Sequence, residues 1–108
     1  MNRLPRKQAQ TAGEVIKEFL RSCHLTPKIN TECIFSAWRE TSGAAPYTSR
    51  LFYRDGILYV TLTSSVVRSQ LQFCKEDILQ RINERLLSDS LFDSTYAGVG
   101  LVREIRLK

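Results

Sequence analysis

The chain of 108 residues is 43% apolar and 25% charged, which predicts one globular domain with its own core and excludes a wholly disordered chain. Lys and Arg outnumber Asp and Glu by 16 to 11, and this net charge of +5 favours a polyanionic partner such as nucleic acid. The excess lies at the two ends: residues 1–10 carry three basic and no acidic residues, residues 103–108 carry three basic residues and Glu104, and residues 11–102 carry ten of each sign.

Residues 1–10 precede the predicted domain. They contain Arg3, Arg6 and Lys7 and only one large aliphatic side chain after Met1, a composition typical of a flexible basic arm. No apolar segment follows these basic residues, and no apolar run in the chain is long enough to cross a bilayer, so neither a signal peptide nor a membrane partner is expected. We therefore expect a cytoplasmic protein with an arm at 1–10 and a single domain at 11–108.

The first predicted helix begins at Thr11. Thr11 and Glu14 have the spacing of a capping box, in which two side chains satisfy free amides at a helix N-terminus. Apolar side chains then recur at helical spacing, at Val15, Ile16, Phe19, Leu20 and Cys23. This spacing predicts a helix that ends at about His24.

The second predicted helix is separated from the first by Pro27 and ends near Gly43, where Pro46 bars its continuation. Asn30 or Thr31 can cap its N-terminus. Its apolar side carries Ile34, Phe35 and Trp38. Because a buried indole N–H needs a hydrogen-bond acceptor, Trp38 is expected to be a core anchor with a polar partner.

A β-hairpin is predicted at residues 48–63. Residues 48–54 and 57–63 are rich in aromatic and β-branched side chains and flank Asp55-Gly56, which suits a type I′ turn because both of its central residues have positive φ. A two-residue turn places Phe52 opposite Tyr59 and determines which side chains share a face. One face carries Leu51, Tyr53, Leu58, Val60 and Leu62. The other face carries Arg50, Phe52, Arg54, Ile57, Tyr59 and Thr61.

A long third helix is predicted from the capping residues Ser64 and Ser65 through Leu86. Its apolar residues recur at steps of four and three, at Val67, Leu71, Cys74, Ile78 and Ile82. Residues 88–100 are rich in turn formers and are interpreted as a surface loop, and residues 101–107 are predicted to be a closing strand with Ile105 and Leu107 inward. The order α-α-β-β-α-β predicts an α+β fold in which helices pack on one face of a three-stranded sheet.

The sequence offers little support for an enzyme. Its one histidine, His24, follows Cys23 directly, and neighbouring residues on a helix diverge by about 100 degrees, so they form no ready nucleophile-base pair. The three cysteines, Cys23, Cys33 and Cys74, are widely spaced, which favours reduced and mostly buried thiols over disulfides. They also lack the paired spacing of zinc ligands, so neither a metal nor another cofactor is expected. Thiol chemistry at Cys23 stays open as a minor alternative.

The second hairpin face combines arginines with aromatic rings. Such a surface can stack bases while it holds phosphates. Two other interpretations stay open: a protein-docking surface, or plain core in which a helix covers Phe52, Ile57 and Tyr59.

An ordered set of residues along most of the chain matches a known pattern. The set comprises Trp38, Ser42-Gly43, Thr48, residues 55–60 (DGILYV), Ser64-Ser65, Leu71, Ile78-Leu79 and Ile82-Asn83. Over about residues 12–108 this set resembles the DciA-like family, long described as a domain of unknown function. The resemblance implies a KH-like domain of a non-enzymatic bacterial protein of DNA replication, in a family whose members bind single-stranded DNA and assist loading of the DnaB-type replicative helicase. The sequence lacks the Gly-x-x-Gly clamp of KH domains and the C-terminal extension of larger members, so DNA association is the stronger expectation and helicase loading the weaker.

The sequence therefore predicts an accessory protein of bacterial DNA replication or repair that binds single strands, with DNA favoured over RNA. The expected contact residues are Arg50, Phe52, Arg54 and Tyr59, with Arg68, Arg106, Lys108, Arg3, Arg6 and Lys7 adding electrostatic attraction. The alternative is a protein-interaction module that docks on a helicase, or forms a weak homodimer, through the hairpin face without binding nucleic acid.

Overall fold

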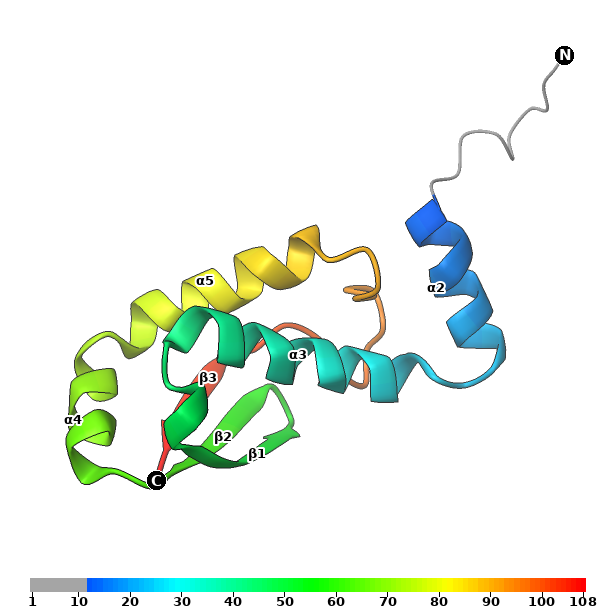
Figure 1. Cartoon of the computed structure of the whole chain (residues 1–108). Coiled ribbons are helices and arrows are strands. Elements are labelled where there is room, and N and C mark those ends of the chain that lie inside the picture. Colours follow the sequence, from blue (N-terminus) through cyan, green and yellow to red (C-terminus); the bar gives the residue numbers. More distant parts are fainter. Residues whose placement is uncertain (1–11) are drawn as a thin grey trace, which may run out of the picture.

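The computed structural model describes residues 12–108, which fold into helices and a three-stranded sheet (Figure 1). In chain order the elements are α2 (Ala12–Ser22), α3 (Thr26–Ser42), the 3₁₀ helix η1 (Ala45–Tyr47), β1 (Thr48–Arg54), β2 (Ile57–Leu62), α4 (Ser65–Phe73), α5 (Lys75–Ser88) and β3 (Glu104–Leu107). The predicted α+β class is confirmed, and the predicted order holds except that the third helix is divided into α4 and α5.

The hairpin has the predicted turn and register. Asp55 and Gly56 have φ values of 51° and 83°, as a type I′ turn requires. Phe52 pairs with Tyr59 and Arg50 pairs with Thr61, with an irregularity only at the start of β1. The alternation of faces is therefore the one that the two-residue turn predicts.

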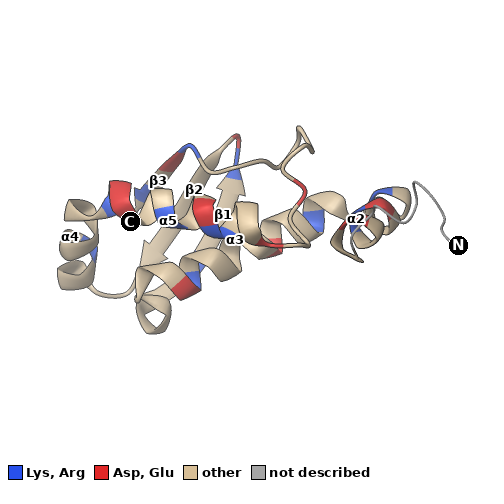
Figure 2. Cartoon of the chain, turned by 90° about the horizontal axis from the view of Figure 1, so that it is seen from above, with Lys and Arg blue, Asp and Glu red and all other residues tan. Residues whose placement is uncertain are grey.

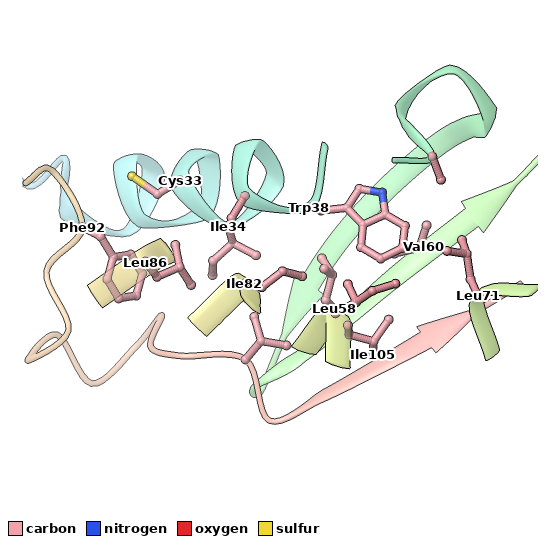
Figure 3. Close-up of a cluster of buried hydrophobic side chains, with 14 of the residues drawn as sticks. Cys33, Ile34, Trp38, Leu58, Val60, Leu71, Ile82, Leu86, Phe92 and Ile105 are labelled. Carbon is pink, nitrogen blue, oxygen red and sulfur yellow. The ribbon is translucent and has the colours of Figure 1, made fainter. Parts of the chain in front are cut away.

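The strand β3 pairs with β2 in parallel, which gives a mixed sheet of order β1-β2-β3. The helices α3 and α5 lie over one face of this sheet (Figure 1). Figure 3 shows the core between these two helices and the sheet. Its largest fully buried side chains include Trp38, Phe92, Ile34, Leu58, Ile82, Leu86, Ile105 and Val60.

Trp38 is the predicted core anchor. Its side chain is 0% exposed, and its indole Nε1 donates a hydrogen bond to Thr48 Oγ1 at 3.0 Å. The Thr48 hydroxyl in turn donates to the carbonyl of Ala44 at 2.8 Å. This relay satisfies the buried polar atom of the indole and ties the end of α3 to the first strand.

The helix α3 begins earlier than predicted. Its first residue is Thr26 and Pro27 lies within the first turn, where the missing amide of proline costs nothing because that amide has no helical partner. Pro27 therefore starts this helix instead of separating two helices, and neither Asn30 nor Thr31 is its cap. The predicted C-terminus is confirmed, since Gly43 adopts a left-handed φ of 70°.

The predicted long third helix is wrong in one respect, because it breaks at Cys74. Ser64 caps α4 as predicted by accepting a hydrogen bond from the amide of Val67 at 3.2 Å. At Cys74 the backbone leaves helical geometry, with φ −112° and ψ 17°, and α5 starts anew with Glu76 and Asp77 in its first turn. Acidic residues stabilise a helix N-terminus, and the break turns Cys74 to an exposed position.

Residues 88–100 are not a plain surface loop. Phe92 is 2% exposed and belongs to the core, and the following residue, Asp93, is 3% exposed. The predicted closing strand is shorter than expected, but Ile105 is buried and Leu107 partly buried, as predicted. Asn83 in α5 binds both backbone groups of Val102, at 2.9 and 3.0 Å, and so guides the chain into β3.

No helix within residues 12–108 is long and apolar enough to cross a membrane. The predicted arm at 1–10 and the capping residue Thr11 lie outside the described residues.

Candidate nucleic-acid interface

The sheet face that points away from α3 and α5 is left open. Its side chains form three rows across the strands, because partners in the register point to the same side. One row contains Arg54, Ile57 and Glu104, and the middle row contains Phe52, Tyr59 and Arg106. The third contains Arg50, Thr61 and Lys108, since the amide of Lys108 donates to Val60 O and its carbonyl accepts from Leu62 N, both at 2.8 Å. We call these nine residues the outer face.

The middle row holds the aromatic rings. The centroids of Phe52 and Tyr59 are 5.8 Å apart with a tilt of 39°, and Arg106 Cζ lies 5.8 Å from the Tyr59 centroid on the opposite flank. Tyr59 is therefore bracketed by a ring and a cation, an arrangement that contributes aromatic and cation–π attraction. Phe52 lies on the edge strand and is 52% exposed, so the interpretation of this face as plain core is wrong for it.

The outer face is hollowed. A depression of about 440 Å³, which we call the hollow, is lined by Arg50, Phe52, Arg54, Tyr59, Thr61 and Lys108. The fold thus brings together five of the seven predicted contact residues within residues 12–108, and Arg106 adjoins them through Tyr59. Arg68 lies in α4 and does not line the hollow. Arg3, Arg6 and Lys7 lie outside the described residues.

The charge of the molecule is distributed unevenly between its two layers. Acidic and basic residues are interspersed along α3 and α5 (Figure 2), and each of these helices contains as many acidic as basic residues. The outer face instead carries Arg50, Arg54, Arg106 and Lys108 against a single acidic side chain, Glu104. Although residues 11–102 have no net charge, the strand register therefore brings basic side chains together on one face of the sheet.

Two of these cations have acidic partners. Arg106 Nε donates to Glu104 Oε2 at 2.9 Å, and this hydrogen bond lowers the pKa of Glu104, which stays ionised at neutral pH. Arg54 Nε lies 3.6 Å from Asp55 Oδ2, with both side chains largely exposed. Such exposed pairs add little stability, but each carboxylate offsets part of the charge that its arginine presents to a polyanion.

The inward side of α2 carries polar side chains beside the buried Leu20. Arg21 Nε donates to Asp93 Oδ2 at 2.6 Å and its Nη2 donates to Thr95 Oγ1 at 3.1 Å. The hydrogen bond from Arg21 outweighs burial and holds the pKa of Asp93 at about 2. Gly13 lies so close to Ser90 that an added Cβ would come within 2.9 Å of the Ser90 Cβ. The polar side of α2 therefore lies against residues 90–95.

The apolar side of α2 faces solvent. Val15, Ile16 and Phe19 are 52%, 40% and 62% exposed, and Leu20 is the one buried side chain of this helix. Sequence reasoning finds the apolar spacing of α2 but not its orientation, because periodicity does not say which side of a helix meets the rest of the molecule.

The cysteines are more exposed than predicted. Cys33 is buried, and burial, assisted by the nearby Asp89 carboxylate, raises the pKa of its thiol to about 12. Cys23 and Cys74 are exposed, so the prediction of mostly buried thiols is wrong. Among residues 12–108, no group of three or more His, Cys, Asp or Glu side chains is placed to hold a metal ion.

A family model described as "Dna[CI] antecedent, DciA" matches residues 11–91, which is 81 of the 108 residues. The chain belongs to the DciA family. The match includes the whole hairpin and the helices α2, α3, α4 and α5 and ends before β3, so Arg106 and Lys108 lie outside it. The DciA family is associated with loading of the DnaB helicase, which supports a role in DNA replication and a helicase partner. Comparisons with curated proteins and with solved structures find no match.

Proposed function

We propose that this DciA protein is a non-enzymatic accessory protein of bacterial DNA replication that binds single-stranded DNA on its outer face. The hollow carries this proposal, because it joins an exposed ring, Phe52, to Arg50, Arg54 and Lys108. Aromatic rings stack on bases and cations hold phosphates, which is the general combination of single-strand binding sites. A duplex keeps its bases stacked and unavailable to such a ring, so single strands are favoured.

Fluorescence anisotropy of a labelled oligothymidine tests this proposal. The logarithm of the affinity should fall with the logarithm of salt concentration by about 0.7 for each neutralised phosphate. Phe52→Ala should weaken binding about tenfold or more, because stacking contributes about 1–3 kcal/mol per base. Phe73→Ala is the matched control, since Phe73 is 93% exposed on α4 and does not line the hollow.

Three outcomes decide this experiment. Loss of affinity in Phe52→Ala with unchanged binding in Phe73→Ala supports the proposal. Undetectable or salt-independent binding contradicts it, and so does equal binding by both variants. Parallel titrations with an oligouridine and with duplex DNA measure the preference for single-stranded DNA.

A second function, docking on the replicative helicase, is favoured by a different surface, the exposed side of α2. Three neighbouring apolar side chains, Val15, Ile16 and Phe19, face solvent there, although exposed apolar groups gain free energy when a partner covers them. The helicase association of the family supplies the partner. This location differs from the sequence-based alternative, which places protein docking on the hairpin.

A pull-down with a DnaB-type helicase separates these two docking surfaces. We expect Phe19→Ala to abolish capture, with Phe73→Ala as a control at a still more exposed position and Phe52→Ala without effect. Capture that is lost in Phe52→Ala and kept in Phe19→Ala would instead assign docking to the hairpin. The measurement is made with nuclease present, so that DNA does not bridge the two proteins.

A further inference from the structure

The two ends of the outer face differ in how their cations are compensated. At one end Arg54 lies 3.6 Å from Asp55 and in the same row as Glu104, which binds Arg106. At the other end, Arg50 and Lys108 have no acidic partner within 4.0 Å among residues 12–108. The uncompensated charge of this face is therefore concentrated at the row of Arg50.

This row also has the geometry of an anion site. Arg50, Thr61 and Lys108 come from three neighbouring chain segments, so the sheet spaces them by about 4.8 Å from one to the next. The two cations flank the Thr61 side chain, and their long side chains can reach a common anion above its hydroxyl. A phosphate bound there displaces no acidic side chain, whereas one bound at Arg54 or Arg106 competes with an existing ion pair.

We propose that Arg50, Thr61 and Lys108 form a phosphate subsite, and that Phe52 in the adjoining row stacks the base attached to that phosphate. The subsite takes a phosphodiester of single-stranded DNA, and in its absence a free phosphate. The natural ligand of this subsite rests on the proposed function. The subsite adds an orientation of the DNA strand, with its sugar-phosphate side toward Arg50 and its base side toward Phe52.

Arg50 and Arg54 provide a matched pair for the test. Both are exposed arginines of β1 that point outward two residues from Phe52, one on each side. We expect Arg50→Gln to weaken oligothymidine binding about tenfold and to reduce the salt slope by about 0.7, because a neutral amide no longer neutralises the phosphate. Arg54→Gln should weaken binding only about twofold, because Arg54 already has a carboxylate beside it. Arg81→Gln, on α5, controls for the change in net charge.

Lys108 should behave as Arg50 does. If both side chains hold one phosphate, Arg50→Gln and Lys108→Gln should be non-additive, and the double variant should lose less affinity than the product of the two single losses. Equal losses in Arg50→Gln and Arg54→Gln overturn the subsite while leaving DNA on the outer face. Unchanged binding in both overturns the subsite and the site of the proposed function together.

A second measurement keeps the subsite testable even if DNA binding is absent. In a titration of the full chain with inorganic phosphate, backbone amide resonances of Arg50, Thr61 and Lys108 should shift. Those of Arg54, Ile57 and Glu104, in the row at the far end, should not. Shifts that are even along the sheet, or larger at the far end, overturn the proposal.

Discussion

The helix α2 and residues 26–108, which we call the body, differ in where their apolar side chains point. In the body the apolar sides of α3 and α5 face the sheet, where Ile34, Trp38 and Ile82 are 0% exposed. In α2 the polar side faces the body through Arg21, and the apolar side of Phe19 faces solvent. The body is thus held by burial of apolar area, whereas α2 is attached through polar contacts and one buried apolar side chain, Leu20. An element attached in this way adds little to stability and leaves its apolar side available to a partner.

The largest expected effect comes from comparing two phenylalanines, one in the body and one on α2. Phe92 is 2% exposed in the core of the body and Phe19 is 62% exposed on α2. We expect Phe92→Ala to lower the free energy of unfolding by about 3–5 kcal/mol through lost burial and a cavity. Phe19→Ala should change it by less than about 0.5 kcal/mol. Urea denaturation measures both, with the slope against urea as the check that the denatured states are alike.

A cost of several kcal/mol in Phe19→Ala would show that α2 packs its apolar side after all, and the contrast would fail. A stable Phe19→Ala variant that no longer captures the helicase would sharpen it, because the side chain would then serve a partner and not the fold.

The β-hairpin shows how much of the outer face the sequence predicts. Asp55-Gly56 admits one tight turn, and side chains in a strand alternate with a period of two, so one dipeptide determines the faces of Phe52 and Tyr59. Lys108 joins this face only through the parallel pairing of β3, which depends on a distant part of the chain. Local signals therefore predict two strands of the candidate site, and tertiary pairing supplies the third.

Asn30 shows why other elements could not be predicted. Its spacing before an apolar run suits an N-cap, yet it is 0% exposed and binds residues more than sixty positions away. The break at Cys74 is similar, because apolar residues continue at helical steps through it. Periodicity reports which side chains are apolar, but it cannot report a distant hydrogen-bond partner or a change of helix direction.

Asn30→Ala should have the second-largest effect. Its amide nitrogen donates to the carbonyls of Asp93 and Val99 at 2.9 and 2.8 Å, and its oxygen accepts from the amide of Asp93 at 2.9 Å. Truncation leaves these backbone groups buried without partners, so we expect a loss of about 2–4 kcal/mol in urea denaturation.

Asn30→Asp is the control for Asn30→Ala, because it keeps the acceptor and removes both donors. It should be nearly as damaging as Asn30→Ala. Since Asp93 anchors Arg21, both variants should also increase hydrogen exchange in α2 more than in α5. Equal increases in the two helices would argue against Asn30 as the residue that links α2 to the body.

Acid should loosen α2 through Asp93. Arg21 holds the pKa of Asp93 at about 2, below the ordinary value of 3.8, so the folded state favours the ionised carboxylate. This stabilisation is fully present above pH about 4 and is lost as the pH falls through 2. It amounts to less than about 2 kcal/mol, because the Arg21 side chain is 50% exposed and its charge is screened.

The measurement is the free energy of unfolding against pH, with α2 followed by hydrogen exchange. Asp93→Asn should remove most of the dependence between pH about 4 and 2. Glu104→Gln is the matched control, because the pKa of Glu104 is also lowered by an arginine, but that pair is exposed on the sheet and adds little stability. If Glu104→Gln flattens the profile as much as Asp93→Asn does, the acid sensitivity does not belong to the attachment of α2.

The last prediction concerns the reaction rates of the thiols, which can be measured without a substitution and which probe α2 and the body separately. Cys23 is exposed just beyond α2, whereas Cys33 is buried in α3 with its pKa raised to about 12 by burial. With a thiol reagent at pH about 8, Cys23 and Cys74, which are both exposed, should react at once, and Cys33 only as fast as the body unfolds. Reaction of all three thiols at one rate would mean that the body opens as readily as α2.

A Cys23 that reacts much faster than Cys74 would restore the hypothesis of thiol chemistry, because exposure alone predicts similar rates. Cys23 follows Phe19 by four residues, so helicase docked on α2 should protect Cys23 and leave Cys74 reactive, which tests the apolar side of α2 without altering it.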